Sequence, residues 1–281
     1  MRVAEGISCR YHGHDVRIAA NFRESGDDLL ILLHGIGCSK ESFDHAFDME
    51  SLYGFSICAF DFPGHGESSK DLPYDFYTLP ALADITERVV GQLVSRRAAG
   101  YRRVCIAGHS MGGAVGVLVA EGSPDIDVMV SIDGNLIGED CGLVSRSIAE
   151  QSTVDFRDTG FADFLAKLRK SEQSDLLAWA QWCAGAEPAA MHEAARSLVE
   201  WSDSRKLLEQ FNELAGKAYL YGAQDDRDYL IPQLASALID TVPGSSHFMM
   251  VDNPDSLYEK LSRALSANEQ CRELAGVSTG G

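Results

Sequence analysis

The sequence lacks any apolar stretch long enough to span a lipid bilayer. Its most apolar run, residues 114–120, is far shorter than the roughly 20 residues that a membrane-spanning helix needs. Residues 1–6 also lack the apolar core of a secretory signal peptide. We therefore expect a cytoplasmic chain that carries no targeting segment and does not bind membranes.

Paired cysteines are missing as well. The seven cysteines are an odd number and form no Cys-x-x-Cys pair, so neither a disulfide framework nor a zinc site is indicated. This scatter is typical of a reduced compartment. His12 and His14 could chelate a metal, but no third ligand is evident. We expect no metal and no cofactor.

Basic residues are scarce relative to acidic ones. The 24 Lys and Arg against 42 Asp and Glu give a net charge of −18, which repels phosphate backbones and argues against nucleic acid as a partner. The composition is otherwise ordinary, with 45% hydrophobic and 23% charged residues. At 281 residues, the chain fits one large domain or a domain with an insertion.

Short, almost continuous apolar runs mark the expected strands. They suit strands buried on both faces of a parallel sheet better than half-exposed strands, and they occupy residues 29–34, 56–61 and 104–108. Helical spacing of apolar residues follows at 78–97, and a small-residue helix at 110–121. Further strands are expected at 128–133, 218–221 and 238–242, and a helix at 254–267.

This alternation of strands and helices predicts an α/β fold with a mostly parallel central sheet flanked by helices. Residues 6–11 and 16–21 predict an antiparallel hairpin at the sheet edge. The strand signal is absent for about 80 residues between Asp133 and Ala218, and helix-forming sequence takes its place. We expect a helical insertion there, and it holds all three tryptophans.

The strongest chemical signal is Gly108-His109-Ser110-Met111-Gly112. It lies between an expected buried strand and an expected helix, the context of a nucleophile elbow, in which a serine occupies a strained turn. Glycines two residues on either side relieve the crowding. Ser110 is therefore the candidate nucleophile.

Two other segments accompany this motif: His34-Gly35-Ile36-Gly37 and Asp61-Phe62-Pro63-Gly64-His65-Gly66-Glu67-Ser68. Together the three segments resemble the elbow, oxyanion loop and D-x-P-G-H-G-x-S turn of the α/β-hydrolase superfamily, in the subgroup with a helical cap. The resemblance implies a core of residues 1–135 and 215–281, a cap of residues 136–214, and a catalytic triad in the order Ser, Asp, His.

His247 fits the triad base, because it lies in a loop after the last expected strand and before a helix start. Two residues compete for the acid. Asp225 matches the family's strand-Gly-x-x-Asp pattern and is preferred, whereas Asp133 ends the preceding strand and is the alternative. The resemblance assigns the oxyanion hole to the backbone amides of Ile36 and Met111.

Five further residues are expected at the substrate pocket. Gly35 keeps the oxyanion loop close to the elbow, Asn135 follows Asp133, and the others are His109, Trp179 and Trp182. A serine at the elbow disfavours the dehalogenases and epoxide hydrolases of the superfamily, which carry aspartate there, and the dienelactone-type members, which carry cysteine.

The resulting prediction is a carboxylesterase-like serine hydrolase that cleaves an ester, thioester or lactone through an acyl-enzyme. Its partner would be a small, neutral or hydrophobic ester-like molecule; the sequence does not predict an oligomeric state. Two alternatives stay open. The same triad serves C–C bond hydrolysis or lyase reactions in this family, and some members bind ligands without catalysis.

Overall fold

An eight-stranded sheet forms the centre of the computed structural model, which describes residues 1–274 except for the side chains of residues 143 and 269–274. The strand order is β1-β2-β4-β3-β5-β6-β7-β8. β1 (Val3–Tyr11) and β2 (His14–Arg23) form an antiparallel hairpin, and β2 also pairs antiparallel with β4 (Phe55–Phe60). All other pairs are parallel.

The central strands are buried along their whole length. This holds for β3 (Asp28–Leu33), β4, β5 (Arg103–His109) and β6 (Val128–Ile132). Their continuous apolar sequence follows from this position, because helices cover both faces of a parallel sheet. β7 (Lys217–Gly222) continues the sheet, and β8 (Leu238–Val242) forms its more exposed edge.

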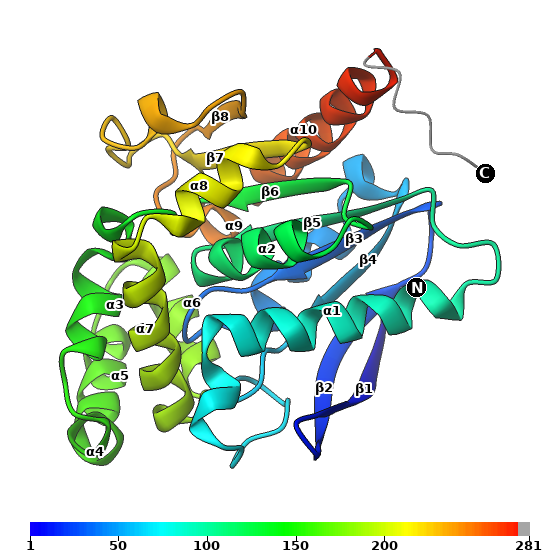
Figure 1. The fold of residues 1–281 in the computed structure, drawn as a ribbon. Helices are drawn as coiled ribbons and strands as arrows, with labels where there is room; N and C mark the ends of the chain where they lie inside the picture. Colours follow the sequence, from blue (N-terminus) through cyan, green and yellow to red (C-terminus); the bar gives the residue numbers. More distant parts are fainter. Residues whose placement is uncertain (275–281) are drawn as a thin grey trace.

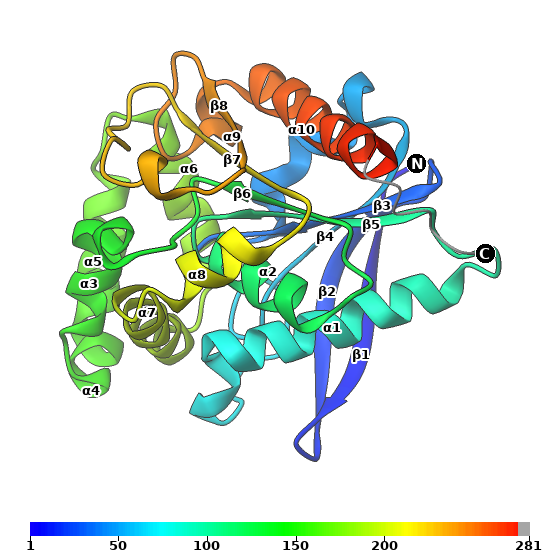
Figure 2. The same ribbon diagram turned by 45° about the horizontal axis from the view of Figure 1, so that its top comes forward.

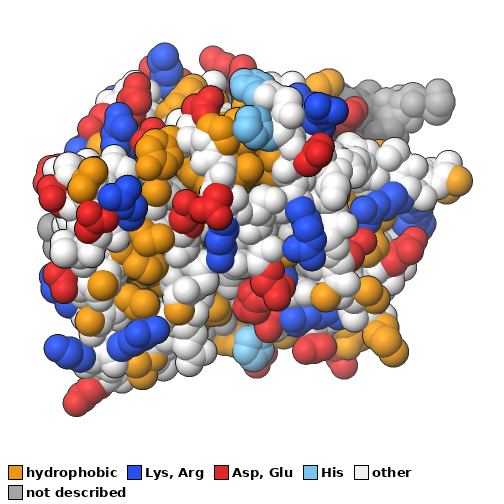
Figure 3. Space-filling view, turned by 90° about the horizontal axis from the view of Figure 1, so that it is seen from below, with side chains coloured by type: hydrophobic (Ala, Val, Ile, Leu, Met, Phe, Trp, Pro, Cys, Tyr) orange, Lys and Arg blue, Asp and Glu red, His pale blue; other side chains and the backbone are white. Residues whose placement is uncertain are grey.

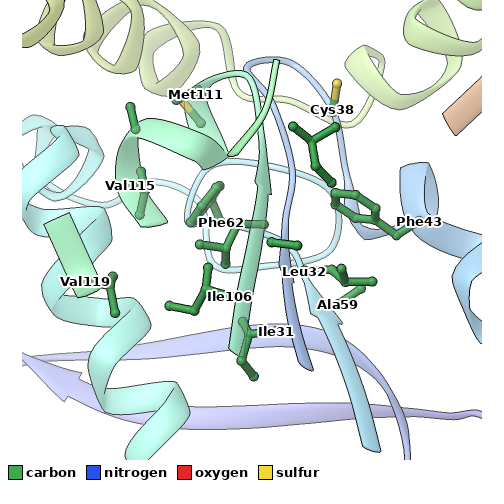
Figure 4. Packing of buried hydrophobic residues seen from close by; sticks show 14 of the residues in the cluster. Ile31, Leu32, Cys38, Phe43, Ala59, Phe62, Ile106, Met111, Val115 and Val119 are labelled. Atoms are coloured by element: carbon green, nitrogen blue, oxygen red, sulfur yellow. The ribbon is translucent and has the colours of Figure 1, made fainter. Parts of the chain in front are cut away.

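Helices cover the two faces of the sheet (Figures 1 and 2). One face carries α1 (Leu79–Arg96), α2 (Met111–Gly122) and α8 (Lys206–Glu213). The other carries α10 (Pro254–Leu274), α9 (Met249–Asp252) and the short helices η1 (Lys40–Phe47) and η2 (Glu50–Leu52). Figure 4 shows Ile106 of β5 on the side of the sheet that faces Val115 and Val119 of α2.

The segment between β6 and β7 is helical. It contains η4 (Gly138–Cys141), α3 (Gly142–Ala149), α4 (Thr153–Asp155), the π-helical turn η5 (Phe156–Gly160), α5 (Phe161–Arg169), α6 (Ser174–Cys183) and α7 (Pro188–Asp203), and it ends with α8. Helices α3 to α7 gather at one end of the sheet (Figure 1). α8 packs against α2 instead, so the last part of residues 136–214 lies on a sheet face.

The α/β fold with its mostly parallel sheet agrees with the sequence prediction. Each expected strand is present with nearly the expected bounds, and the helix expected at 254–267 extends to Leu274. The remaining short helices are η3 (Tyr74–Tyr77) and η6 (Ile231–Gln233). Within residues 1–274, no helix combines the length and hydropathy needed to cross a bilayer. On the face in Figure 3, acidic and basic side chains lie intermixed.

Candidate active site

Ser110 occupies a strained turn between β5 and α2. Its backbone has φ 53° and ψ −121°, a region that residues with a side chain rarely adopt. Backbone bonds anchor the turn: the Ser110 N–H donates to Ile132 O at 3.1 Å, and the Ser110 carbonyl accepts the Gly113 N–H at 2.8 Å. The strain is thereby held by β6 on one side and α2 on the other, as expected at a functional turn.

The two glycines of the motif are required by close backbone packing. A Cβ at Gly108 would lie 2.1 Å from Gly112 O, and one at Gly112 would lie 2.2 Å from Leu33 O. Neither approach is possible for a residue with a side chain. The Gly-x-Ser-x-Gly spacing thus lets β3, β5 and α2 meet directly below the serine.

His247 points its Nδ1 at a buried carboxylate. Nδ1 lies 2.6 Å from Asp133 Oδ2, and the Asp133 side chain is fully buried. Burial alone would raise the pKa of Asp133, but the hydrogen bonds and charges of His247 and Arg227 outweigh it and hold that pKa well below its ordinary value. The acid therefore stays ionised beside the imidazole.

This geometry favours the alternative acid, Asp133, over the preferred Asp225. In the structure the imidazole bonds to the alternative, Asp133, while the Asp225 carboxylate lies 3.9 Å from Arg227 and its buried Oδ2 has no hydrogen-bond partner among the described residues. Burial and the nearby Asp133 charge raise the pKa of Asp225. The Gly-x-x-Asp spacing locates Asp225 on the right loop but does not aim it at His247.

Arg227 holds Asp133 from the opposite side. Its Nε donates to Oδ1 at 2.7 Å and its Nη2 to Oδ2 at 2.6 Å, a bidentate pair. Its Nη1 donates to the Tyr229 hydroxyl at 2.9 Å, which donates to Asp140 Oδ1 at 2.8 Å. With Tyr219 OH at 3.4 Å from Oδ1, donors surround the Asp133 carboxylate.

His109, the variable residue of the elbow motif, braces the loop that carries His247. Its Nε2 lies 2.9 Å from the His247 carbonyl oxygen, so Nε2 carries the proton and donates it there. Burial and the neighbouring His247 lower the pKa of His109 to about 3, which keeps the ring neutral. His109 thus lines the site and fixes the position of its proposed base.

The loop after β3 approaches the elbow as expected. A Cβ at Gly35 would lie 2.9 Å from His109 Nδ1 and 3.1 Å from Ser110 Cβ, so only glycine fits without a shift. Ile36 follows Gly35 and lines the cavity beside Ser110. Met111 is the first residue of α2 and is fully buried. The two proposed amide donors therefore belong to a residue that lines the same cavity as Ser110 and to the residue that follows Ser110 in the chain.

Ser110 and His247 open into one cavity of about 180 Å³. Both polar and apolar side chains line it. The lining includes seven of the predicted residues: Gly35, Ile36, His109, Ser110, Asn135, Trp179 and His247. The Ser110 hydroxyl donates a hydrogen bond to Asn135 Oδ1 at 3.3 Å, and among the described residues Asn135 is the partner of this hydroxyl.

The two tryptophans of α6 differ in their relation to this cavity. Trp179 lines it and donates its indole N–H to Ile36 O at 3.1 Å. Trp182 is not part of the lining; its ring lies 6.3 Å from that of Phe248, beside the site. The lining of this cavity therefore gives no support to substrate contact through Trp182, which stays a prediction.

Within residues 1–274, no group of three or more His, Cys, Asp or Glu side chains is arranged to hold a metal ion. His12 and His14 lie on the β1–β2 hairpin, where the His12 ring stacks on Tyr11 and the His14 ring contacts Phe76 edge-on.

A family model described as "Alpha/beta hydrolase family" matches residues 30–260, which is most of the chain. The chain belongs to the alpha/beta hydrolase family.

Solved structures of other alpha/beta hydrolases share this fold. A mutant of the N-acyl homoserine lactonase AidH with bound N-hexanoyl homoserine lactone superposes with a TM-score of 0.77 over 95% of this chain and 99% of that one, at 17% identity. A putative aryl esterase from Burkholderia cenocepacia gives 0.74 over 95% and 100%, at 19% identity.

Among curated sequences, a "Putative esterase/lipase 2" from Mycoplasma pneumoniae is 36% identical over 89 residues, which is 32% of this chain and 31% of that protein. The chain therefore aligns with about a third of the length of such relatives.

The sequence did not reveal several residues of this hydrolase site. Arg227, Asp140, Ser145 and Phe248 all line the cavity. The sequence could have indicated Arg227, because it directly follows Asp225 and Asp226. A cation next to two carboxylates is a candidate ion-pair partner for either of them. Asp140 and Ser145 carry no motif, because their place depends on how the insertion folds over the strand ends, whereas Phe248 directly follows the proposed base in the chain.

Proposed function

We propose that this alpha/beta hydrolase cleaves an ester, thioester or lactone through an acyl-enzyme, with Ser110 as nucleophile, His247 as general base and Asp133 as the orienting acid. The observation that carries the proposal is the 2.6 Å contact between His247 Nδ1 and the buried Asp133 carboxylate, on a histidine that lines the same cavity as Ser110. The family membership and the esterase and lactonase relatives support it.

The hydrogen bond to Asp133 decides which imidazole nitrogen does the chemistry. Nδ1 carries a proton and donates it to the carboxylate, so Nε2 is the nitrogen that can accept the Ser110 proton. As Ser110 Oγ attacks the carbonyl carbon, its proton passes to Nε2. The imidazolium then returns that proton to the departing alcohol, thiol or ring oxygen, and Asp133 stabilises the positive charge.

The second half-reaction uses the same groups on water. His247 takes a proton from a water molecule, whose oxygen attacks the acyl carbon, and the proton then returns to Ser110 as the ester bond breaks. In both steps the carbonyl oxygen becomes negative. We assign its stabilisation to the backbone N–H groups of Ile36 and Met111, aided by the N-terminus of α2.

The Ser110 side chain must turn during this cycle. In the structure its hydroxyl bonds to Asn135 Oδ1 at 3.3 Å, and the Asn135 amide nitrogen in turn donates to Asp140 O at 2.8 Å. We infer that this long bond holds the serine in a resting position. Substrate binding then favours the rotamer that faces His247, as catalytic bonds often tighten only in the complex.

The cavity favours a compact substrate. A volume of about 180 Å³ suits a short acyl group or a small lactone ring rather than a long chain. Ile36, Trp179 and Phe248 offer an apolar wall for the acyl group, and Asn135 and Ser145 offer polar groups for the carbonyl side or the leaving group. We propose that helices α3 to α7 act as a cap that excludes water from this space.

Two measurements test the proposed function. The first is hydrolysis of p-nitrophenyl esters of graded chain length; we expect the highest kcat/KM for acetate to butyrate and a marked decline beyond hexanoate. The second is the same assay on Ser110→Ala, with Ser123→Ala as a matched control outside the site. Turnover that survives in Ser110→Ala, or that is absent for esters, thioesters and lactones alike in the native chain, would refute the proposal.

A further inference from the structure

The peptide bond between Ile36 and Gly37 is held from both sides. On one side, Trp179 of α6 donates its indole N–H to the Ile36 carbonyl oxygen at 3.1 Å. On the other, the Gly37 N–H donates to Nε2 of His65 at 3.3 Å. Both polar atoms of one peptide unit thus have a side-chain partner, one from the helical insertion and one from the core.

His65 is a dependable acceptor for this bond. Its Nδ1 lies 3.1 Å from the Pro63 carbonyl oxygen and so carries the proton, which leaves Nε2 as the acceptor. Burial lowers the pKa of His65 to about 3, and the imidazole ring therefore stays neutral at every pH near neutrality.

This peptide is the centre of a tight turn. The Cys38 N–H donates to Gly35 O at 3.1 Å, and Gly37, the third residue of the turn, has φ +62°. Ile36 is not among the residues with positive φ, so the signs match a type II turn. Types I and II differ by a flip of their central peptide, here the one between Ile36 and Gly37.

Both partners oppose such a flip. A flipped peptide would turn its carbonyl oxygen toward the lone pair of His65 Nε2 and its N–H toward the indole N–H of Trp179, so two acceptors and two donors would face each other. The flip would also change the backbone angles of Ile36, whose own N–H is the proposed donor to the reacting carbonyl oxygen. That N–H belongs to the preceding peptide, so the held peptide restrains the donor through the Ile36 Cα that the two peptides share.

The helical insertion also packs directly on Gly37. A Cβ there would meet Met191 Cε at 3.0 Å, Trp179 Nε1 at 3.1 Å and Cys183 Sγ at 3.3 Å. Trp179 is 6% exposed, and its ring lies 5.2 Å from Phe248, the residue after the proposed base. One side chain of the insertion thus contacts the loop of the proposed oxyanion donor and the loop of the proposed base.

We propose that Trp179 is a positioning residue that locks the central peptide of the Gly35–Cys38 turn in its catalytic orientation, so that docking of the helical insertion and formation of the oxyanion-binding loop are coupled. The effect on rate rests on the proposed function; the lock itself does not. This role differs from a substrate contact, because it uses the indole N–H rather than the face of the ring.

Trp179→Phe separates the two roles, because it keeps an aromatic ring in the cavity wall and removes the N–H donor. Trp201→Phe is the matched control: it makes the same change in α7, where the ring stacks with Lys206 away from the cavity. A neutral hydrogen bond contributes about 0.5–1.5 kcal/mol net, which corresponds to about a two- to tenfold effect.

Two readouts are needed. The first is amide hydrogen exchange of Gly37 by NMR: we expect it to be about fivefold faster or more in Trp179→Phe and unchanged in Trp201→Phe. The second is ester hydrolysis: we expect kcat to fall about three- to tenfold in Trp179→Phe with KM within twofold, and Trp201→Phe to match the native chain.

Unchanged Gly37 exchange in Trp179→Phe, or a rise in KM with kcat intact, would overturn the proposal and leave Trp179 as a substrate contact. Thermal unfolding of both variants checks that a general loss of structure does not cause the effect. If the native chain hydrolyses no ester, the proposed function fails, and the exchange measurement still decides whether the lock exists.

Discussion

Replacing Asp133 with asparagine is the most informative change to the proposed triad. The Asp133 carboxylate accepts bonds from His247 Nδ1 at 2.6 Å and from Arg227 Nε and Nη2 at 2.7 and 2.6 Å. An amide has a single acceptor oxygen, so at least one of these donors would face an NH2 group. The negative charge is lost as well, and the part-buried Arg227 cation then opposes formation of a positive His247 during the reaction.

The size of the effect follows from the lost charge. Two unit charges about 4 Å apart attract by about 4 kcal/mol at an effective dielectric constant of about 20. At about 1.4 kcal/mol per tenfold, this predicts that Asp133→Asn lowers kcat about a thousandfold. If the amide NH2 turns toward His247, the wrong tautomer forms and the loss approaches the roughly 10⁴ seen in the best-studied triad.

The assay is kcat for a short p-nitrophenyl ester, with Asp225→Asn as the matched control. We expect Asp225→Asn to keep kcat within about threefold. Asp133→Asn leaves the part-buried Arg227 cation without its partner, so we also expect lower stability, and Asp133→Asn/Arg227→Met serves as a second check. Recovery of the melting temperature with kcat still low supports the assignment. A larger loss of kcat in Asp225→Asn than in Asp133→Asn would refute it.

Three further predictions follow from the same contacts. Gly35→Ala introduces a Cβ 3.1 Å from Ser110 Cβ, so we expect kcat to fall at least tenfold. Its control, Gly91→Ala, lies in the open middle of α1 and should keep the native kcat while raising the free energy of unfolding by up to about 1 kcal/mol. Equal kinetics for the two variants would contradict this. Arg227→Met leaves the fully buried Asp133 carboxylate without its part-buried cation and should cost about 3 kcal/mol of stability in urea unfolding, partly recovered in Arg227→Lys. A neutral result would mean that Asp133 needs no cation. Burial lowers the pKa of His34 to about 4, below the ordinary 6.5 of the unfolded chain, so on acidification the unfolded state binds the proton first. The free energy of unfolding should therefore be constant above about pH 7 and fall by a few kcal/mol toward pH 4. Urea midpoints that stay level from pH 8 to 5 would exclude this effect.

The local patterns in the sequence were sufficient for the fold and for the strained turn that carries the proposed nucleophile. The strands β3 to β6 are buried on both faces, so their apolar runs are continuous and their bounds easy to read. The turn at Ser110 depends on glycines two residues away, whose spacing is itself visible in the sequence. His247 was found because its loop follows the last strand and precedes a helix.

The acid could not be chosen from the sequence, because two strand ends compete for it. Asp133 and Asp225 follow β6 and β7, which are neighbours in the sheet, and both carboxylates lie near Arg227. What separates them in the structure is the hydrogen bond of Asp133 to His247, made from a backbone with a φ of 45°. A positive φ at an aspartate leaves no trace in residue spacing.

The contacts of the helical insertion could not be predicted from sequence patterns either. Trp179 and Trp182 are three residues apart in one helix and looked equivalent, yet only Trp179 lines the cavity and reaches Ile36 O. The difference depends on the rotation of α6 against the loop after β3, a long-range packing result. Such residues are found only once the helices are placed in space.

Covalent trapping tests the central claim most directly. The native chain and its Ser110→Ala and His247→Ala variants are incubated with a fluorophosphonate, digested, and mapped by mass spectrometry. The proposed mechanism predicts one adduct, on the peptide that contains Ser110, formed at least a hundredfold more slowly in His247→Ala and not at all in Ser110→Ala. An adduct on another residue, or labelling at the native rate without the imidazole, would contradict it.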